Sequence, residues 1–143
     1  GTIEDLPKKC QKALSEMITK TKKNTSLNLT LALSYSSRSE ITQAVKKIIS
    51  KEKPKDGDDI TELLISEHLQ TFDTPDPELL IRTSGEKRIS NFLLWQVAFS
   101  ELYFSEKKWP DFDEEELYMA IFDYQKRERR FGKTTEQVND EII

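Results

Sequence analysis

The chain has 143 residues, enough for one domain, and its 36% hydrophobic and 34% charged residues predict a helix-rich protein with a modest core. The net charge of −4 argues against bulk attraction to nucleic acid or an anionic membrane, so any anion site must be local. The single cysteine, Cys10, excludes an internal disulfide and fits a reducing cytoplasm. No apolar run approaches the ~20 residues of a membrane span.

The first half of the chain alternates helical and strand-like patterns. Apolar residues at helical spacing predict a helix over Asp5–Lys23, with Cys10 packed on its apolar side. Leucines at every second position predict a strand over Leu27–Ser34, covered on both faces. A second helix follows with Ser37 or Ser39 as its cap, and a short third helix covers residues 60–69.

The second half repeats the alternation. Leu79–Ile81 and Leu102–Phe104 are predicted strands, and residues 91–99 form either a helix start or a buried apolar turn. Asp113 should cap a long helix, with Glu116 as its capping-box partner. We expect that helix to carry Lys126, Arg127, Arg129 and Arg130 in its last turn and to stop at Gly132, before a polar tail over residues 133–143.

This alternation predicts an α/β fold, part of an open, mainly parallel sheet with flanking helices. Only three strands are predicted, fewer than such sheets usually have, so the chain is expected to be part of a larger fold. It opens at Gly1 directly into a helix-like pattern, so we expect this fold to be truncated at its N-terminus. Residues 1–132 would form one domain with the tail appended. In open parallel sheets, ligands bind at the carboxyl ends of strands.

One loop at such a strand end has the residue types of an anion site. Arg82, Arg88 and Ser90 lie within nine positions of one another, with Gly85 between them. Guanidinium groups hold phosphate oxygens in a two-point fashion, and a helix starting near Ser90 would add its N–H groups. On residue types alone, a phosphate site and a solvated charged loop remain equal alternatives.

Three other groups of residues invite a functional reading. Arg38 follows the predicted strand at residues 27–34 and is either an exposed arginine or a further anion contact. The acidic group at residues 56–59 lacks the spacing of a calcium loop, so we interpret it as a loop and helix cap. The only histidine, His68, is interpreted as structural.

Three stretches together resemble the C-terminal signature of the cis-prenyltransferases, and most of all their bacterial undecaprenyl diphosphate synthases: Glu78–Phe104, Trp109–Phe112 and Tyr124–Gly132. The resemblance is dense over residues 75–132. Over residues 27–49 it is looser, and Tyr35-Ser36-Ser37-Arg38 stands where the family has Tyr-Gly-Gly-Arg.

The resemblance implies that isopentenyl diphosphate units are added with cis double bonds to an allylic diphosphate such as farnesyl diphosphate. The product would be a long polyprenyl diphosphate, a lipid carrier for cell-wall precursors. It also implies a cytoplasmic homodimer that needs Mg2+, with peripheral membrane contact through its lipid product. Transferred by motif, the diphosphate of isopentenyl diphosphate would be bound by Arg82, Arg88 and Ser90.

The resemblance implies further site residues. Glu101 would contribute to the Mg2+ site, near the active site of the other subunit in the dimer. Arg130 and Gly132 match an Arg-x-Gly element associated with diphosphate binding across that dimer, although a basic helix end needs no such cause. Arg38 matches the last position of the Tyr-Gly-Gly-Arg element.

Family elements of the N-terminal part do not occur in this sequence. One is His-x-x-Gly-Asn, and another is Met-Asp-Gly-Asn-Gly-Arg-Trp, whose Asp ligates Mg2+; Phe-Ser-x-Glu-Asn-Trp-x-Arg is also absent. We therefore expect the intact enzyme to be a cis-prenyltransferase and these 143 residues alone to be inactive. The alternatives are a non-catalytic partner subunit of such an enzyme and a phosphate-binding module unrelated to prenyl transfer.

Overall fold

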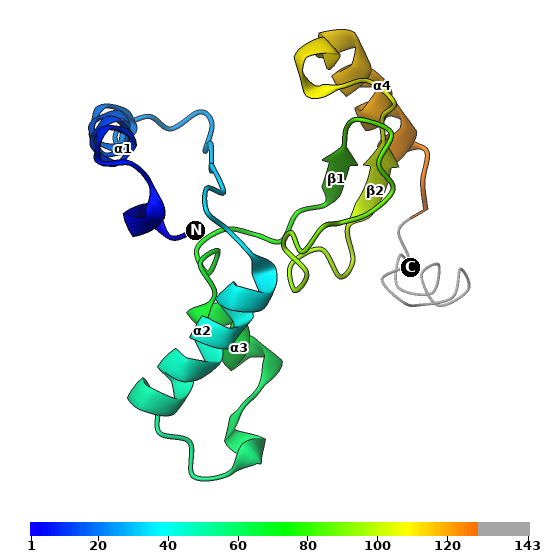
Figure 1. Ribbon diagram of the computed structural model, residues 1–143. Helices are drawn as coiled ribbons and strands as arrows, with labels where there is room; N and C mark the ends of the chain where they lie inside the picture. Colours follow the sequence, from blue (N-terminus) through cyan, green and yellow to red (C-terminus); the bar gives the residue numbers. More distant parts are fainter. Residues whose placement is uncertain (129–143) are drawn as a thin grey trace. The chain divides into compact units, whose positions relative to one another are not determined.

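The computed structural model describes residues 1–128, which divide into two compact units (Figure 1). The first unit holds Gly1–Pro75 together with Asn91–Leu93, and the second holds Asp76–Ser90 and residues 94–128. Within the described residues, no helix is long and apolar enough to cross a membrane.

The core of the first unit lies between two helices. α2 spans Ser37–Lys51 and α3 spans Glu62–His68, and the two pack against each other. Ala44 and Ile48 of α2 are fully buried, and Leu69 at the end of α3 is nearly so. These positions follow the helical spacing of the apolar residues, so the predicted helices are confirmed. A short 3-10 helix over Gly57–Asp59, capped by the Asp56 side chain, confirms the cap interpretation of the acidic group.

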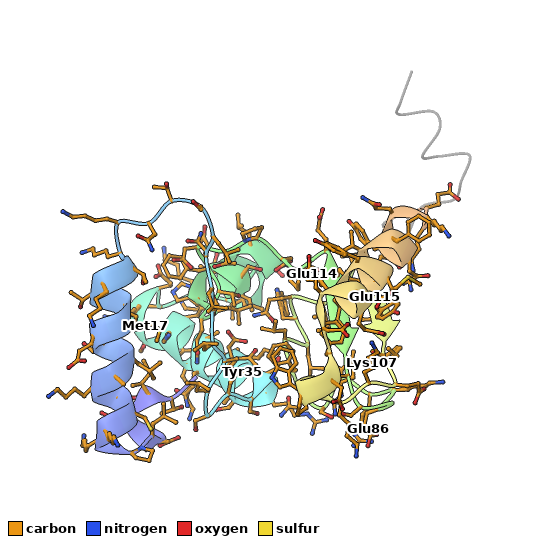
Figure 2. The ribbon with its side chains drawn as sticks, turned by 90° about the horizontal axis from the view of Figure 1, so that it is seen from above. Met17, Tyr35, Glu86, Lys107, Glu114 and Glu115 are labelled. Carbon is orange, nitrogen blue, oxygen red and sulfur yellow. The ribbon has the colours of Figure 1, made fainter. Side chains whose placement is uncertain are left out.

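The first helix of the chain leaves its apolar stripe uncovered. A short 3-10 turn over Ile3–Asp5 precedes α1, which spans Lys8–Thr21 and is therefore shorter at both ends than predicted. Met17 is 54% exposed, and its place on α1 is visible in Figure 2. Cys10 is exposed as well, so the prediction that it packs in a core is wrong. The spacing of the stripe was correct, but the described residues do not bury it.

The predicted strand at residues 27–34 does not form. This segment has no regular secondary structure, and Leu27 and Leu29 are 81% and 74% exposed. A strand needs a neighbour that completes its backbone hydrogen bonds, and no described strand pairs with this segment. The sheet therefore has two strands among the described residues instead of the three expected.

The second unit contains the parallel sheet. β1 spans Leu79–Arg82 and β2 spans Glu101–Phe104, paired in parallel with Leu79 opposite Glu101 and Arg82 opposite Phe104. A 3-10 turn over Trp109–Asp111 leads to α4, Glu114–Gln125, which lies against β2 (Figure 1). Two parallel strands with a flanking helix confirm the α/β class and the parallel pairing.

Both ends of α4 differ in part from the prediction. Asp113 caps the helix as expected, because its Oδ1 accepts a hydrogen bond from the Glu116 N–H at 3.0 Å. Glu116 does not complete a capping box, since its carboxylate is engaged by other groups described below. The helix ends at Gln125, so Lys126 and Arg127 follow it instead of forming its last turn. The predicted roles of Arg129, Arg130, Gly132 and the tail lie outside the described residues.

The segment after the arginine loop is a series of turns over residues 91–99. The first of the two alternatives for this segment, a helix start, is therefore wrong. Val97 is buried but Phe99 is 64% exposed, so the second alternative, a buried apolar turn, is confirmed only in part. The helix N-terminus expected near Ser90, with its N–H groups available to an anion, does not exist in this structure.

Candidate functional site

The loop after β1 is fastened to the segment after β2. The Ser105 N–H donates to the Arg82 carbonyl at 2.8 Å, and the Gly85 N–H donates to the Ser105 carbonyl at 2.9 Å. The Ser84 N–H donates to the Lys107 carbonyl at 2.7 Å. Ser84 and Gly85 both have positive φ angles, 73° and 68°, and at Gly85 an added Cβ would meet the Glu106 carboxylate. The loop thus takes a backbone shape that favours glycine at position 85.

Arg82 lines a hollow at the carboxyl end of β1. The hollow has a volume of about 510 Å3. Its walls are Ile81, Arg82, Thr83, Ser84, Trp109, Phe112 and Leu117. Trp109 and Phe112 stack with their rings 6° from parallel and their centroids 6.3 Å apart. No carboxylate among the described residues forms an ion pair with Arg82. One cation therefore faces an apolar wall, an arrangement that suits an amphipathic anion.

The other two residues of the predicted site are placed differently. Arg88 is an exposed side chain and forms an ion pair with Glu86, two positions before it. Ser90 is exposed and has a φ angle of 53°. Neither residue lines the hollow beside Arg82. An exposed ion pair of this kind contributes little to stability, so a polyanion can replace Glu86 as the partner of Arg88 at low cost.

Arg38 belongs to the first unit, and its backbone is engaged by Asn91. The Arg38 N–H donates to Asn91 Oδ1 at 3.0 Å, and the Ser37 N–H donates to the Asn91 carbonyl at 2.9 Å. Asn91 Nδ2 in turn donates to Ser36 Oγ at 2.7 Å. The amide groups at the start of α2 are thus satisfied by a residue more than fifty positions away, and neither Ser37 nor Ser39 is the cap. The Arg38 side chain is exposed.

The serines at positions 36 and 37 fit the backbone that they occupy. Ser36 has φ −151° and ψ 125°, an extended conformation open to any residue, and Ser37 is the first residue of α2. Tyr35, just before them, donates a hydrogen bond to buried Glu40. Burial, followed by the bond to Glu40, raises the pKa of Tyr35 to about 12. This segment is therefore a fixed helix entry that requires no glycine.

Glu101 is bonded to Arg127. Its Oε2 accepts from Arg127 Nη1 at 2.8 Å, and Arg127 Nη2 reaches Asp123 Oδ2 at 2.5 Å. The bond to Glu101 raises the pKa of Arg127, against desolvation, and Asp123 adds to the effect. One guanidinium group therefore neutralises two carboxylates at this end of β2.

Arg82 and Glu101 lie at opposite ends of the strand pair. Arg82 is the last residue of β1, whereas Glu101 is the first residue of β2 and lies opposite Leu79. Three residues at ~3.3 Å each separate the two levels by about 10 Å along the strands. The structure therefore does not bring these two predicted site residues together within one chain.

We tested whether the described residues fit a magnesium ion. Mg2+ takes oxygen ligands and usually one or two carboxylates, completed by water and phosphate oxygens. No group of three His, Cys, Asp or Glu gathers as a metal site within residues 1–128. Glu101 can supply one carboxylate, but Arg127 holds one of its oxygens. Among the described residues, Glu101 therefore offers one carboxylate toward a magnesium ion, and these residues form no complete site.

A network between β2 and α4 was not foreseen from the sequence. Ser105 is almost fully buried, and its Oγ donates to Glu116 Oε1 at 2.8 Å. Lys107 Nζ lies 3.4 Å from Glu116 Oε2 and 3.4 Å from Asp113 Oδ1. Desolvation alone would lower the pKa of Lys107, but the two carboxylates outweigh it and raise the pKa. The only sequence signal was the position of Glu116 in the first turn of α4.

A two-stranded parallel sheet, a flanking helix and an arginine at a strand end define an α/β protein with a candidate anion site. Residues 1–132 match the family described as "Putative undecaprenyl diphosphate synthase". The isoprenyl transferase of Porphyromonas gingivalis is 50% identical over 142 residues, which cover 96% of this chain and 55% of the relative. That of Chlorobaculum tepidum is 52% identical over 140 residues, 96% of this chain and 53% of the relative. The chain therefore belongs to the undecaprenyl diphosphate synthase (isoprenyl transferase) family.

Solved structures agree with this family. A lavandulyl diphosphate synthase from Lavandula x intermedia, crystallised with dimethylallyl diphosphate, has a TM-score of 0.88 and 39% identity. The match covers 93% of this chain and 58% of that one. A structure titled "probable undecaprenyl diphosphate synthase" from Campylobacter jejuni has a TM-score of 0.78 and 34% identity, over 93% of this chain and 61% of that one. The chain spans about half the length of the curated relatives it matches.

Proposed function

We propose that the hollow beside Arg82 binds isopentenyl diphosphate and that the intact protein elongates an allylic diphosphate with cis double bonds. The whole enzyme would then make a long polyprenyl diphosphate in the cytoplasm and touch the membrane through this lipid. The family membership supports the reaction class. The observation that carries the proposal for this chain is the composition of the hollow, where one arginine faces an apolar wall.

The ligand and the hollow have complementary chemistry. Isopentenyl diphosphate has a multiply charged diphosphate and a five-carbon apolar group. Arg82 supplies a two-point hydrogen-bond donor without a carboxylate partner among the described residues, and the exposed Trp109 and half-buried Phe112 supply apolar surface. A guanidinium at this place would also stabilise charge that develops on a diphosphate during reaction. Arg88 and Ser90 would close around the outer phosphate of the ligand. Ser90 would give up its contact with solvent, and Arg88 would give up its ion pair with Glu86.

Magnesium would be held at a different place from the Arg82 hollow of the same chain. Glu101 lies at the end of the strand pair opposite to Arg82. This separation supports the proposal that Glu101 contributes a magnesium ligand to the active site of a second copy in a homodimer. When bound, Mg2+ would neutralise the diphosphate of the substrate. Arg127 would then hold Glu101 in place until the ion and its phosphate ligands complete the site. Arg130 and Gly132 remain proposed contacts across the same dimer, and Arg38 a proposed further contact to an anion.

The proposal is tested by calorimetric titration of the chain with isopentenyl diphosphate. Arg82→Ala removes a charge-assisted contact worth roughly 1.5–3 kcal/mol, so the affinity should fall by about ten- to a hundredfold. Arg88→Ala should weaken binding less, because Arg88 does not line the hollow. Lys12→Ala, on exposed α1, is the matched charge control and should have no effect.

Two outcomes would contradict the proposal. Unchanged affinity in Arg82→Ala and Arg88→Ala would exclude the hollow as the diphosphate site. Turnover of farnesyl and isopentenyl diphosphates with Mg2+ by these 143 residues alone would show that no further chain is needed for the reaction. We expect no product from this piece, and polyprenyl product from the full-length protein.

A further inference from the structure

The hollow beside Arg82 has two walls that come from different parts of the second unit. One wall is the end of β1 and the loop after it, with Arg82, Thr83 and Ser84. The other is the turn before α4 and its first turn, with Trp109, Phe112 and Leu117. A ligand that touches both walls requires them to keep a fixed spacing. The question is which contacts set that spacing.

Beyond the β1–β2 ladder, the first wall is held through Ser105 and Lys107. All three backbone hydrogen bonds between the loop and the rest of the unit, from Ser84, from Gly85 and to the Arg82 carbonyl, end on these two residues. Ser105 Oγ also accepts from the Lys107 N–H at 3.2 Å, which fixes the turn that carries both carbonyls. The position of the loop therefore depends on the position of the Ser105–Lys107 turn.

The Glu116 side chain joins the second wall to both Ser105 and Lys107 of the same turn, and Asp113, next to Phe112, adds a second contact to Lys107. Glu116 precedes Leu117 in α4, and its Oε1 accepts from Ser105 Oγ at 2.8 Å and from the Tyr103 hydroxyl at 3.4 Å. Its Oε2 lies 3.4 Å from Lys107 Nζ. The carboxylate is mostly buried, with 17% of its side-chain surface exposed. A buried carboxylate with several donors holds its geometry more strictly than an exposed pair does.

We propose that Glu116 is a positioning residue of the anion site, which sets the conformation of the Arg82–Gly85 loop through Ser105 and Lys107. Glu116 does not line the hollow and touches no ligand there. It acts through the bond to Ser105 Oγ, which keeps the accepting carbonyls of Ser105 and Lys107 under the Gly85 and Ser84 N–H groups. That this loop binds an anion rests on the proposed function. That Glu116 fixes the conformation of the loop is a property of the chain without ligand and can be tested separately.

The chain offers closely matched variants for a test. Glu116→Gln keeps Oε1 as an acceptor for Ser105 and removes the charge that faces Lys107. Glu116→Ala and Ser105→Ala both remove the bond between the two residues. Glu115→Ala is the control, since Glu115 is an exposed glutamate one position earlier in the same helix turn (Figure 2). Glu115 and Glu116 carry the same charge near the N-terminus of α4, so both substitutions to alanine lose the same favourable interaction with the helix dipole.

The first measurement is hydrogen exchange of the Ser84 and Gly85 amides in the unliganded chain. Loss of a hydrogen bond of ~1.4 kcal/mol corresponds to about tenfold, so these amides should exchange on the order of tenfold faster in Glu116→Ala and Ser105→Ala. Glu116→Gln should keep their exchange close to that of the unchanged chain, and Glu115→Ala should leave it unchanged. Amides of α2, in the other unit, should not respond to any of these changes. A merely destabilising substitution would instead speed exchange throughout the second unit.

The second measurement is the affinity for isopentenyl diphosphate in the same variants. We expect Glu116→Ala to bind isopentenyl diphosphate more weakly than the unchanged chain. The affinity of Glu116→Gln should be close to that of the unchanged chain. Unchanged Ser84 and Gly85 exchange in both Glu116→Ala and Ser105→Ala would overturn the positioning role. If the unchanged chain binds no isopentenyl diphosphate, the proposed function fails, and the exchange data still decide the positioning role. If Glu116→Ala does not fold, Glu116→Asp provides the same decision, because it keeps the charge while its shorter side chain withdraws the acceptor from Ser105 Oγ.

Discussion

Residues 27–33 and the β1–β2 pair are both rich in aliphatic residues, but only the second forms regular structure. Leu27, Leu29, Leu31 and Leu33 are all exposed, and the segment forms no ladder with another described strand. β1 and β2 pair in register and continue into the bonds that Ser84, Gly85 and Ser105 make beyond their ends. The candidate site thus lies where strand pairing and the bonds beyond it fix the backbone, and not in the unpaired aliphatic segment.

The largest expected effect is on the free energy of unfolding, when a buried and an exposed aliphatic side chain are each truncated to alanine. Ile48→Ala removes a fully buried side chain from the α2–α3 core and should cost about 2–5 kcal/mol of unfolding free energy. Leu27→Ala, in the exposed segment, should stay within about 0.5 kcal/mol. Urea unfolding followed by circular dichroism measures both. Equal losses in the two variants would mean that residues 27–33 are covered in solution.

A smaller effect should follow from the cap of α2. Asn91→Ala removes the side-chain bond to the Arg38 N–H, and loss of a helix cap costs about 1 kcal/mol. Alanine also tolerates the φ of 60° at this position less well than asparagine does. Asn28→Ala, in the exposed segment, is the matched control and should be neutral. A neutral Asn91→Ala in the same urea experiment would rule out the long-range cap.

The smallest effect concerns pH, at the point where the exposed segment gives way to buried structure. The pKa of Tyr35 is about 12 in the folded chain and 10.0 ordinarily, so the folded chain holds the phenol proton more tightly than the unfolded chain does. Between pH 10 and 12 the unfolded chain binds fewer protons than the folded one, and stability falls as pH rises through this window. A difference titration at 295 nm between the unchanged chain and Tyr35→Phe should show one tyrosine ionising near pH 12. A midpoint near pH 10 would refute the burial and the bond to Glu40 as its causes.

Much of the fold was predictable because it depends on local pattern. The apolar spacing gave α2, α3 and α4, and the short apolar runs at Leu79 and Leu102 gave two strands whose parallel pairing followed from the alternation with helices. The same reasoning failed at residues 27–33. Periodicity shows which side chains could share a face, but the pairing partner of a strand lies elsewhere in the chain or in another chain.

The site was predictable in its residue types and less so in its geometry. The Arg82 loop at a strand end followed from the position of Arg82 after an apolar run. Three features did not follow, because each depends on residues far apart in sequence. They are the cap from Asn91 to the start of α2, the bond from Arg127 to Glu101, and the hold of Glu116 on Ser105. The separation of Arg82 from Glu101 also required the strand register.

The central claim is that the Arg82 hollow receives the diphosphate of isopentenyl diphosphate, and amide chemical-shift mapping tests it most directly. Titration of the 15N-labelled chain should shift the Ser84 and Gly85 amides and those around Trp109 in a saturable manner. The amides of Leu29 and Leu31 should stay unshifted, and Arg82→Ala should move saturation to an isopentenyl diphosphate concentration about ten- to a hundredfold higher. Shifts that are absent from the loop, or that persist unchanged in Arg82→Ala, would contradict the assignment of this hollow as the diphosphate site.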